Sequence, residues 1–335
     1  MTTHIPTRTR ILVTGGAGFI GSHLTDALLE ANHQVVVLDN LSNGSLRNLS
    51  NASGNPNFKF IQGDVTVRED CRAATQDVDV VFHLACLGVR HSIHSPWENH
   101  CVNAEGTLKL LEASKQSGVK RFFYISTSEV YGMTPSFPIT EDSLTSPVTV
   151  YGASKLAGEN YAIAYFRCYG FPATVFRIFN NYGPRAHYEG DAGEVIPRTI
   201  VRILSDKQPV VFGDGEITRD FFYVKDTARA LVGLMGVPGL DGSTTNIGAG
   251  KEYTMKTIVE SLLRLTEKAE LRIQYLDPRP GDVPRLWVDP RKFHQLTGFV
   301  ARYQLEQGLR ETISYYEELL LHEDLLAKVK VRNWE

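Results

Sequence analysis

Cysteine is scarce in this chain of 335 residues, and the few thiols present show neither the density of a disulfide scaffold nor the spacing of metal ligands. Those residues are Cys71, Cys86, Cys101 and Cys168. We therefore expect reduced thiols and no metal site. Cys86 follows a predicted strand end, where a ligand could pass, but a small buried apolar side chain is the simpler interpretation.

Long apolar runs are also lacking, since none approaches the ~20 residues that a helix needs to cross a lipid bilayer. The first residues, Met1–Thr9, are polar and contain no apolar stretch of the kind found in a secretory signal. The sequence therefore predicts a soluble, cytoplasmic protein that has no membrane partner.

Neither sign of charge is in large excess. The chain has 35 lysine and arginine residues against 38 aspartate and glutamate residues, a formal net charge of −3. This balance offers no broad basic surface for nucleic acid. Any phosphate group must then be held in a local pocket. With 42% hydrophobic residues, the chain can bury one large core or two interlocked lobes.

Short runs rich in Val, Ile and Phe alternate with helical patterns in the first half of the chain. The runs read as strands buried on both faces, which is typical of a parallel sheet. They are Arg10–Thr14, Gln34–Asp39, Phe58–Asp64, Val78–Ala85 and Arg121–Ser128. Strand–helix alternation implies right-handed crossovers, so we predict an α/β, doubly wound parallel sheet.

After about residue 180 the pattern loosens into loops rich in Gly, Pro and charge, with short strands and helices between them. We expect a first domain over residues 1–180, to which some later segments return. Residues 181–335 would form a smaller, interwoven α/β lobe. A helix is predicted around Leu305–Leu321, and the last few residues are expected to form a loose tail.

The first predicted strand runs directly into a glycine loop, Thr14-Gly15-Gly16-Ala17-Gly18-Phe19-Ile20-Gly21. Glycines at 15, 18 and 21 allow a tight turn and let backbone N–H groups approach a pyrophosphate at a helix N-terminus. The loop follows a strand and opens an amphipathic helix, and this context makes a dinucleotide-binding (Rossmann-type) site a specific prediction.

An acidic residue, Asp39, ends the second predicted strand and is followed by Asn40. A carboxylate there can accept hydrogen bonds from both ribose hydroxyls of NAD and would repel the 2′-phosphate of NADP, so NAD is the predicted cofactor. Asp64, at the end of the third strand, is a candidate for the adenine edge, although such a residue also forms ordinary turns.

Tyr151 and Lys155 are four residues apart at the start of a predicted helix, a spacing that stacks them on one helical face. An ammonium near a phenol favours the phenolate and lowers the tyrosine pKa toward a value useful for a general base. The nearby strand end, Ser126-Thr127-Ser128, adds hydroxyl groups.

Several motifs in this order make the chain resemble an extended short-chain dehydrogenase/reductase of the NAD-dependent nucleotide-sugar epimerase/dehydratase group. Besides the glycine loop and the Tyr151/Lys155 pair, the resemblance rests on six further segments. These are His83-Leu84-Ala85, Asn103-x-x-Gly106-Thr107, Ser126–Gly132, Arg177–Arg185 with Arg219-Asp220-Phe221, and Arg279-Pro280-Gly281-Asp282.

The resemblance implies a role for individual residues. Tyr151 would take the proton from the sugar O4 during oxidation at C4, Thr127 would hydrogen-bond O4, and Lys155 would hold the nicotinamide ribose. Substrate binding would fall to Asn180, Arg219, Arg279 and Asp282, with a salt bridge from Arg219 to Asp220 or Asp226 as the structural alternative. Further cofactor contacts would come from Phe19, Ile20, Val65, Leu84, Ala85 and Asn103.

Glu129 leaves the outcome of C4 oxidation open. Members of the group that remove a C5 proton or a carboxylate typically have a carboxylate there, and simple UDP-galactose 4-epimerases do not. The Thr127-Ser128-Glu129 segment resembles UDP-glucuronate decarboxylases, and Ser128 replaces the Asp typical of dTDP-glucose 4,6-dehydratases. Glu129 could equally be a structural carboxylate bonded to nearby backbone.

We expect 4-epimerisation of a UDP-hexose first, with decarboxylation or 4,6-dehydration as the alternative. Arg90 is either a ligand for a sugar carboxylate or phosphate, or a solvated loop residue. Two alternative functions belong to other classes of protein. One is a reductase that consumes NAD(P)H, and the other is a catalytically inactive, cofactor-binding regulator. The resemblance also implies a homodimer formed by helices around residues 100–117 and 152–169.

Overall fold

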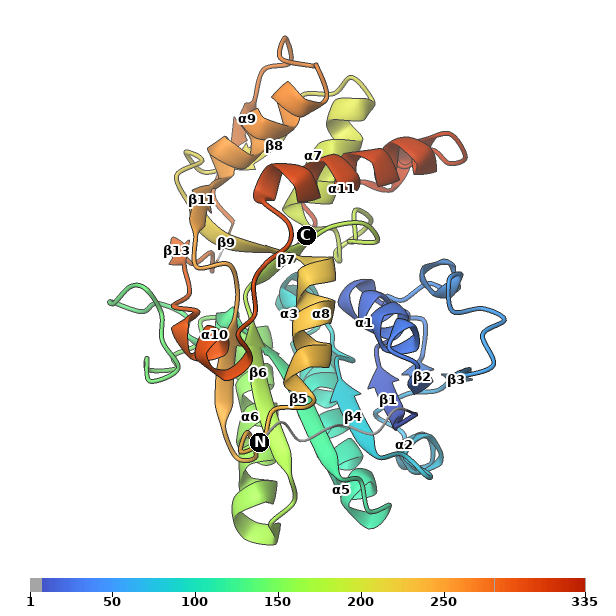
Figure 1. Cartoon of the computed structure of the whole chain (residues 1–335). Coiled ribbons are helices and arrows are strands. Elements are labelled where there is room, and N and C mark those ends of the chain that lie inside the picture. Colours follow the sequence, from blue (N-terminus) through green and yellow to red (C-terminus); the bar gives the residue numbers. More distant parts are fainter. Residues whose placement is uncertain (1–7, 280, 335) are drawn as a thin grey trace.

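The computed structural model describes residues 8–279 and 281–334. Most of the polar stretch Met1–Thr9, the Pro280 of the Arg279–Asp282 motif and Glu335 lie outside the described residues. Two lobes are visible in Figure 1, a large one built on a parallel sheet and a smaller one above it.

The large lobe contains a seven-stranded sheet in which every neighbouring pair is parallel. The strand order is β10-β6-β5-β4-β1-β2-β3. The strands are β1 (Arg10–Thr14), β2 (Gln34–Asp39), β3 (Phe58–Gln62), β4 (Val80–His83), β5 (Arg121–Thr127), β6 (Ala173–Ile178) and β10 (Thr244–Ile247). The predicted doubly wound α/β fold is confirmed, and β10 returns to this sheet from the second half of the chain.

Three of the predicted strands end early. β3 stops at Gln62, β4 at His83 and β5 at Thr127. The residues beyond these ends leave the sheet because they line a cavity at its carboxyl edge. That edge is where parallel α/β sheets bind ligands.

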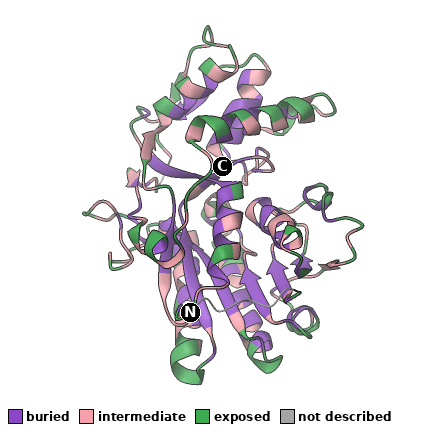
Figure 2. Ribbon diagram, in the orientation of Figure 1, coloured by how far each residue is buried: buried purple, intermediate pink, exposed green. Residues whose placement is uncertain are grey.

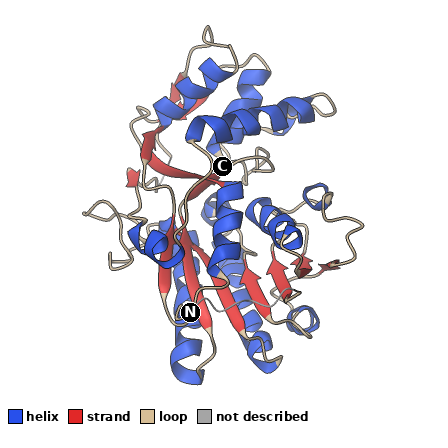
Figure 3. Ribbon diagram, in the orientation of Figure 1, coloured by secondary structure: helices blue, strands red, loops and turns tan. Residues whose placement is uncertain are grey.

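Helices cover both faces of the sheet (Figure 3). On one face, α1 (Phe19–Glu30), α8 (Val224–Leu234) and α10 (Arg291–Thr297) enclose a core that includes Leu24, Leu231 and Phe293. On the other face lie α2 (Arg68–Ala74), α5 (Thr107–Gln116) and α6 (Val150–Tyr169), which pack around Leu110, Phe122 and Ala162. The inner strands between these layers are buried on both sides, as Figure 2 shows, whereas the edge strand β3 is only partly buried, because no strand in the described part of the chain pairs with its outer edge.

Short helical turns connect β4 to α5 and surround the cavity. They are α3 (Val89–His94), α4 (Pro96–His100) and a π-helical turn over Cys101–Gly106. A 3₁₀ turn over Ser128–Val130 follows β5, and another over Leu46–Leu49 follows β2. Among the helices that the structure describes, none combines the length and apolarity needed to cross a bilayer.

The smaller lobe has its own core, which includes Ile200, Leu262 and Tyr316. Strand β9 (Thr218–Tyr223) pairs with β7 (Asn180–Tyr182), β11 (Glu252–Thr254) and β13 (Arg285–Leu286), while β8 (Val210–Phe212) pairs with β12 (Gln274–Leu276). Helices α7 (Val195–Leu204), α9 (Met255–Leu265) and α11 (Leu305–Leu320) pack together over them. A 3₁₀ turn over Leu326–Lys328 follows α11.

The expected loose tail after α11 is wrong. Asn333 is 1% exposed and Trp334 is 9% exposed. The buried guanidinium of Arg198, on α7, donates to the side chain of Asn333 and to the carbonyls of Lys330 and Val331. One side chain thus satisfies three acceptors of residues 330–333 and holds this segment against the small lobe. The composition of the segment had indicated no fixed structure there.

Candidate active site

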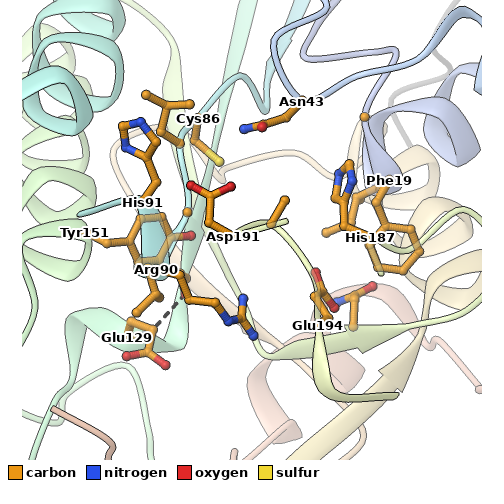
Figure 4. Close-up of a pocket in the computed structure, with 18 of the residues that line it drawn as sticks. Phe19, Asn43, Cys86, Arg90, His91, Glu129, Tyr151, His187, Asp191 and Glu194 are labelled. Carbon is orange, nitrogen blue, oxygen red and sulfur yellow. Dashed lines mark hydrogen bonds between the residues drawn. The ribbon is translucent and has the colours of Figure 1, made fainter. Parts of the chain in front are cut away.

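One cavity of about 770 Å³ runs along the carboxyl edge of the parallel sheet and into the small lobe. The glycine loop, the ends of β2, β3, β4 and β5, and the start of α6 line one part of it. The other part is lined by β7, β8, β9 and α7. Figure 4 shows Tyr151, Arg90 and Glu129 on one side of the space, with His187 and Phe19 on the other.

The glycine loop has the tight geometry that the sequence predicts. Gly15 has φ +68°, and a Cβ there would lie 2.7 Å from the backbone nitrogen of Ala85. A Cβ on Gly21 would lie 2.2 Å from the Gly15 carbonyl oxygen, so only glycine lets α1 start this close to the loop. No side chain caps the start of α1, where Gly18 is the N-cap. Its N-terminal N–H groups therefore remain available to an anion.

Asp39 lies at the end of β2 on the cavity wall, with its orientation fixed by the backbone. One carboxylate oxygen accepts the N–H of Ala17 at 2.9 Å and the other accepts that of Leu41 at 2.8 Å. Burial raises the pKa of Asp39, and these two backbone bonds oppose that shift. The carboxylate retains lone pairs for ribose hydroxyls, so its position fits the predicted NAD site.

Asp64 also lines the cavity but is already engaged. It accepts hydrogen bonds from Thr66 and from the Asn40 side chain, the latter at 2.7 Å. Burial tends to raise the pKa of Asp64, and these hydrogen bonds outweigh it and hold the pKa below its usual value. Asn40 and Asp64 therefore form a linked pair beside Val65 on the cavity wall.

Most of the other predicted cofactor residues also line the cavity, whereas Asn103 does not. The residues that line it are Phe19, Ile20, Leu84 and Ala85. The Asn103 amide is buried and holds the segment after β4, accepting from the N–H of Leu87 and donating to its carbonyl. It also donates to Ser154 on α6 at 3.1 Å. Asn103 thus positions the loop that follows Cys86. Cys86 lines the cavity, and Asn103 acts from behind it.

Tyr151 and Lys155 both point from the first turns of α6 toward the end of β5. The helix begins at Val150, where the Thr149 side chain accepts the N–H of Gly152. The Lys155 ammonium donates to the Ile125 carbonyl at 2.6 Å, and it lies 4.3 Å from the centre of a tyrosine ring on β5. Sequence spacing alone therefore placed this pair correctly on one helical face.

The predicted effect of Lys155 on the Tyr151 pKa is not the dominant one. Burial raises the pKa of Tyr151 well above its ordinary value, and a hydrogen bond with Thr127 acts only partly against it. Burial also lowers the pKa of Lys155, whose ammonium is directed to a backbone carbonyl. Without a further positive charge in the cavity, the phenol is favoured over the phenolate.

Glu129 sits in the 3₁₀ turn after β5, and its side chain lines the cavity with Thr127 and Ser128. Its backbone N–H donates to the Thr127 hydroxyl at 3.2 Å, the dashed line in Figure 4. Over residues 8–279 and 281–334, no hydrogen bond or ion pair engages the carboxylate itself. The structural alternative, a carboxylate bonded to nearby backbone, is therefore not what the fold contains.

Two arginines converge on one carboxylate at the small-lobe end of the cavity. Asp282 accepts from Arg219 at 2.8 Å and from Arg279 at 2.7 Å through the same oxygen. The alternative pairing of Arg219 with Asp220 or Asp226 does not occur, because those carboxylates accept backbone N–H groups elsewhere. The paired guanidiniums retain donors for an anion such as a diphosphate.

Two predicted polar residues face the cavity with side-chain groups that make no hydrogen bond in the part of the chain that the structure describes. The side-chain oxygen of Asn180 is buried and makes no hydrogen bond within the described chain. Arg90, on α3, likewise has no hydrogen bond or ion pair there, and burial lowers the pKa of its guanidinium to about 10. Arg90 is therefore a cavity residue and not a solvated loop residue (Figure 4).

Sequence reasoning missed a group of titratable residues in the loop before α7. His187, Asp191 and Glu194 line the cavity, and Asp191 is paired with His94 at 2.8 Å. Burial raises the pKa of Glu194, against the attraction of Arg90. The segment before α7 has no periodicity or family motif that would have marked these side chains, since they reach the cavity only through the folding of the second lobe.

A Rossmann-type parallel sheet with a tyrosine–lysine pair at its carboxyl edge is typical of dinucleotide-dependent enzymes. Comparison with known proteins identifies the family. Residues 11–248 match the model of the NAD dependent epimerase/dehydratase family. A putative UDP-glucose 4-epimerase of Methanocaldococcus jannaschii is 35% identical over 312 residues, covering 91% of this chain and 97% of that protein. The chain belongs to this NAD-dependent family, which confirms the predicted family, enzyme class and cofactor.

The names of other relatives state other reactions. UDP-glucuronic acid decarboxylase 1 of Xenopus tropicalis is 35% identical over 322 residues, covering 94% of this chain and 74% of that protein. The crystal structure of UDP-glucuronic acid 4-epimerase from Bacillus cereus, in complex with UDP-glucuronic acid and NAD, has a TM-score of 0.87 and 34% identity. That similarity covers 93% of this chain and all of the other.

Proposed function

We propose that this enzyme inverts C4 of a nucleotide-activated hexose, with UDP as the preferred nucleotide, through a transient 4-keto sugar. The observation that most supports this function is the group Tyr151, Thr127 and Lys155, which meets the glycine loop in a single cavity. Similarity to named UDP-sugar 4-epimerases over nearly the whole chain points the same way.

In this proposal the proton of the sugar O4 goes to Tyr151. Thr127 holds O4 by a hydrogen bond, and the neighbouring Ser128 supplies a second hydroxyl beside it. Lys155 anchors the nicotinamide ribose and fixes the start of α6 against β5. NAD, when bound, supplies the hydride acceptor for C4. Burial raises the pKa of Tyr151, so a positive charge close to the phenol would favour its action as a base.

The binding roles divide between the lobes. Residues 1–180, with Asp39 and the glycine loop, would hold the dinucleotide, whereas residues 181–335 would hold the nucleotide sugar. Asn180 offers an unpaired carbonyl oxygen, and Arg219 and Arg279 offer donors to the diphosphate. Arg90 would face the sugar from α3. An epimerase holds its 4-keto intermediate until the hydride returns, and a site that encloses both ligands suits that demand.

A second candidate function rests on Glu129, whose carboxylate lines the cavity with no protein partner in the described chain. A free carboxylate beside Tyr151 and Thr127 could remove the C5 proton of a 4-keto hexose, after which the C6 hydroxyl leaves as water. With a 4-keto uronic acid the C6 carboxylate would leave as CO₂ without loss of the C5 proton, and the protonated Glu129 could then supply a second proton to C5. The decarboxylase among the relatives is consistent with this alternative.

Real-time proton NMR in D₂O separates the two. UDP-glucose, UDP-N-acetylglucosamine and UDP-glucuronate are offered in separate tubes to the NAD-loaded enzyme. A change of the H4 coupling from axial to equatorial, with C5 keeping its proton, supports the 4-epimerase. Deuterium at C5, or departure of hydroxyl or CO₂, replaces that function with the second one. Net formation of NADH or consumption of added NADH contradicts both.

We also propose that the enzyme works in the cytoplasm as a homodimer. The helices expected at the interface, α5 and α6, carry apolar side chains that the monomer leaves open. Leu108 is 37% exposed, Phe166 is 36% exposed and Tyr169 is 60% exposed. Sedimentation equilibrium would test this state, and a monomer at micromolar concentration would contradict it.

A further inference from the structure

The cavity continues beyond the paired arginines into the small lobe, where its character changes. In the small lobe the wall that includes Arg219 is made largely of apolar side chains from β8, from the loop before β9 and from the start of α9. They are Val210, Val211, Phe212, Ile217 and Met255, and Trp334 joins them from the far end of the chain. A sugar ring rich in hydroxyl groups would find few hydrogen-bond partners on such a wall, whereas a flat aromatic group could pack against its apolar side chains.

The lobe that carries each group indicates which part of a ligand reaches this wall: Tyr151 belongs to α6 of the large lobe, whereas Arg219 and the apolar wall belong to the small lobe. Tyr151 marks the reacting sugar, and Arg219 and Arg279 mark the diphosphate that follows it. In a nucleotide sugar the diphosphate joins the sugar to the nucleoside. The nucleoside therefore extends past the arginines, toward Phe212 and Trp334.

The segment 330–334 places Asn333 and Trp334 in this wall through specific contacts. Arg198, 8% exposed, donates through Nη1 to the side chain of Asn333 at 3.1 Å and through Nη2 to two backbone carbonyls of the segment. The Asn333 amide donates in turn to the Gly193 carbonyl at 2.8 Å. The Trp334 ring stands edge-on to Phe212, with ring centres 4.7 Å apart and planes at 72°.

One polar group in this cluster lacks a partner. The Nε–H of Arg198 is buried and makes no hydrogen bond within the described chain, although Arg198 lines the cavity. A buried donor without an acceptor is costly, and it becomes satisfied when a ligand supplies an oxygen. This orphan donor is independent of the aromatic pair and also points to a bound, oxygen-rich group.

We infer that Asn333 and Trp334 form the nucleotide-recognition wall of the substrate site, with the base lying against Trp334 and Arg198 holding the segment while offering Nε–H to a ligand oxygen. This inference rests on the proposed nucleotide-sugar substrate and adds to it a specificity-determining segment. Aromatic side chains bind bases through π stacking, which tolerates different bases. Trp334 thus contributes affinity for the nucleotide and takes no part in C4 chemistry.

The test measures nucleotide binding without turnover. UDP, dTDP, CDP and GDP are titrated calorimetrically into the NAD-loaded wild-type protein, and the tightest ligand is kept. Trp334→Ala should weaken it by roughly tenfold or more, the loss expected for one base–aromatic stack, and Trp334→Phe should recover most of that loss. Val331→Ala, in the same segment but 38% exposed and away from the cavity, should bind as the wild type does.

The inference is overturned if no nucleoside diphosphate binds, or if Trp334→Ala and Val331→Ala bind equally well. A failed epimerase assay alone would leave these titrations unchanged, so the two proposals fail separately. Should Trp334→Ala not fold, Trp97→Phe combined with Trp287→Phe leaves Trp334 as the one indole of the chain. Its fluorescence must then change on adding the nucleotide, and unchanged emission at saturation contradicts the contact.

Discussion

Arg219 donates a hydrogen bond of 2.8 Å to the Asp282 oxygen that also accepts from Arg279. The carboxylate thereby keeps two like-charged guanidiniums side by side on the cavity wall. Such an arrangement suits a diphosphate, because a substrate phosphate can use the donors that Asp282 leaves free.

Arg219→Gln should therefore weaken substrate binding and spare the chemistry. Loss of one charge-assisted hydrogen bond costs about 1.5–3 kcal/mol, which raises KM by roughly one to two powers of ten. We expect kcat to stay within a few-fold, since Arg219 bonds Asp282 and none of the residues proposed to act on C4. Steady-state kinetics measure this, with the exposed Arg310→Gln as the control. An equal fall of kcat would mean that Arg219 acts in the transition state.

Tyr151→Phe should abolish turnover while the protein keeps its NAD. The change removes the group proposed to take the O4 proton, and loss of such a base costs about 10²–10⁴-fold or more in rate. Bound NAD is measured by releasing it from denatured protein. Turnover above a hundredth of the wild-type rate would overturn the assigned role, whereas loss of NAD would show that the phenol mainly shapes the cofactor site.

Glu129→Gln distinguishes the two candidate functions. The glutamine keeps the size of the side chain but cannot accept a C5 proton. A 4-epimerase should tolerate it within about tenfold, because its chemistry needs only Tyr151 and Thr127. An enzyme that removes the C5 proton should lose roughly 10²–10⁴-fold. Both effects are read from initial rates on the substrate identified by NMR, with the thermal midpoint recorded to exclude unfolding.

Two buried histidines should make the fold sensitive to acid. Burial lowers the pKa of His23 and that of His83 to about 3, from an ordinary 6.5. Their stabilising contribution is complete above pH 6.5 and is lost as the pH falls from there toward 3, because the unfolded chain binds the protons. Between pH 6.5 and 5 each histidine should cost about 1.6 kcal/mol of unfolding free energy.

Urea unfolding at the two pH values measures that loss. His23 bonds the Pro184 carbonyl at 2.9 Å, a bond that a glutamine amide can replace without titrating. His23→Gln should therefore reduce the difference in unfolding free energy between the two pH values. An unchanged difference would mean that His23 stays uncharged in the unfolded chain or ionises freely in the folded one.

Two helical glycines should respond oppositely to alanine. In α1, a Cβ on Gly21 would lie 2.2 Å from the Gly15 carbonyl oxygen. Gly21→Ala should force the loop apart, lower stability by roughly 1–3 kcal/mol and release NAD. In α8, a Cβ on Gly233 meets nothing within 4 Å, so Gly233→Ala should add up to about 1 kcal/mol and keep NAD. Thermal melts and NAD content measure both variants.

Local pattern was enough to predict the cofactor half of the molecule. The strands of the parallel sheet, the turn at Gly15 and the acid at Asp39 are set by spacing within short segments, because a buried strand and a tight turn each demand particular residues. The Tyr151/Lys155 pair was equally readable, since residues four apart share one face of a helix. Those features carried the prediction of family and cofactor.

Tertiary structure alone decided the rest of the cavity. The partner of Arg219, the free carboxylate of Glu129 and the arrival of Glu194 beside Arg90 depend on contacts between segments far apart in the chain. Trp334 is the clearest case, because its neighbours left no periodic signal and it was expected in a loose tail. Its burial comes from Arg198 and Phe212, residues more than a hundred positions earlier, and such long-range packing is not written in any local pattern.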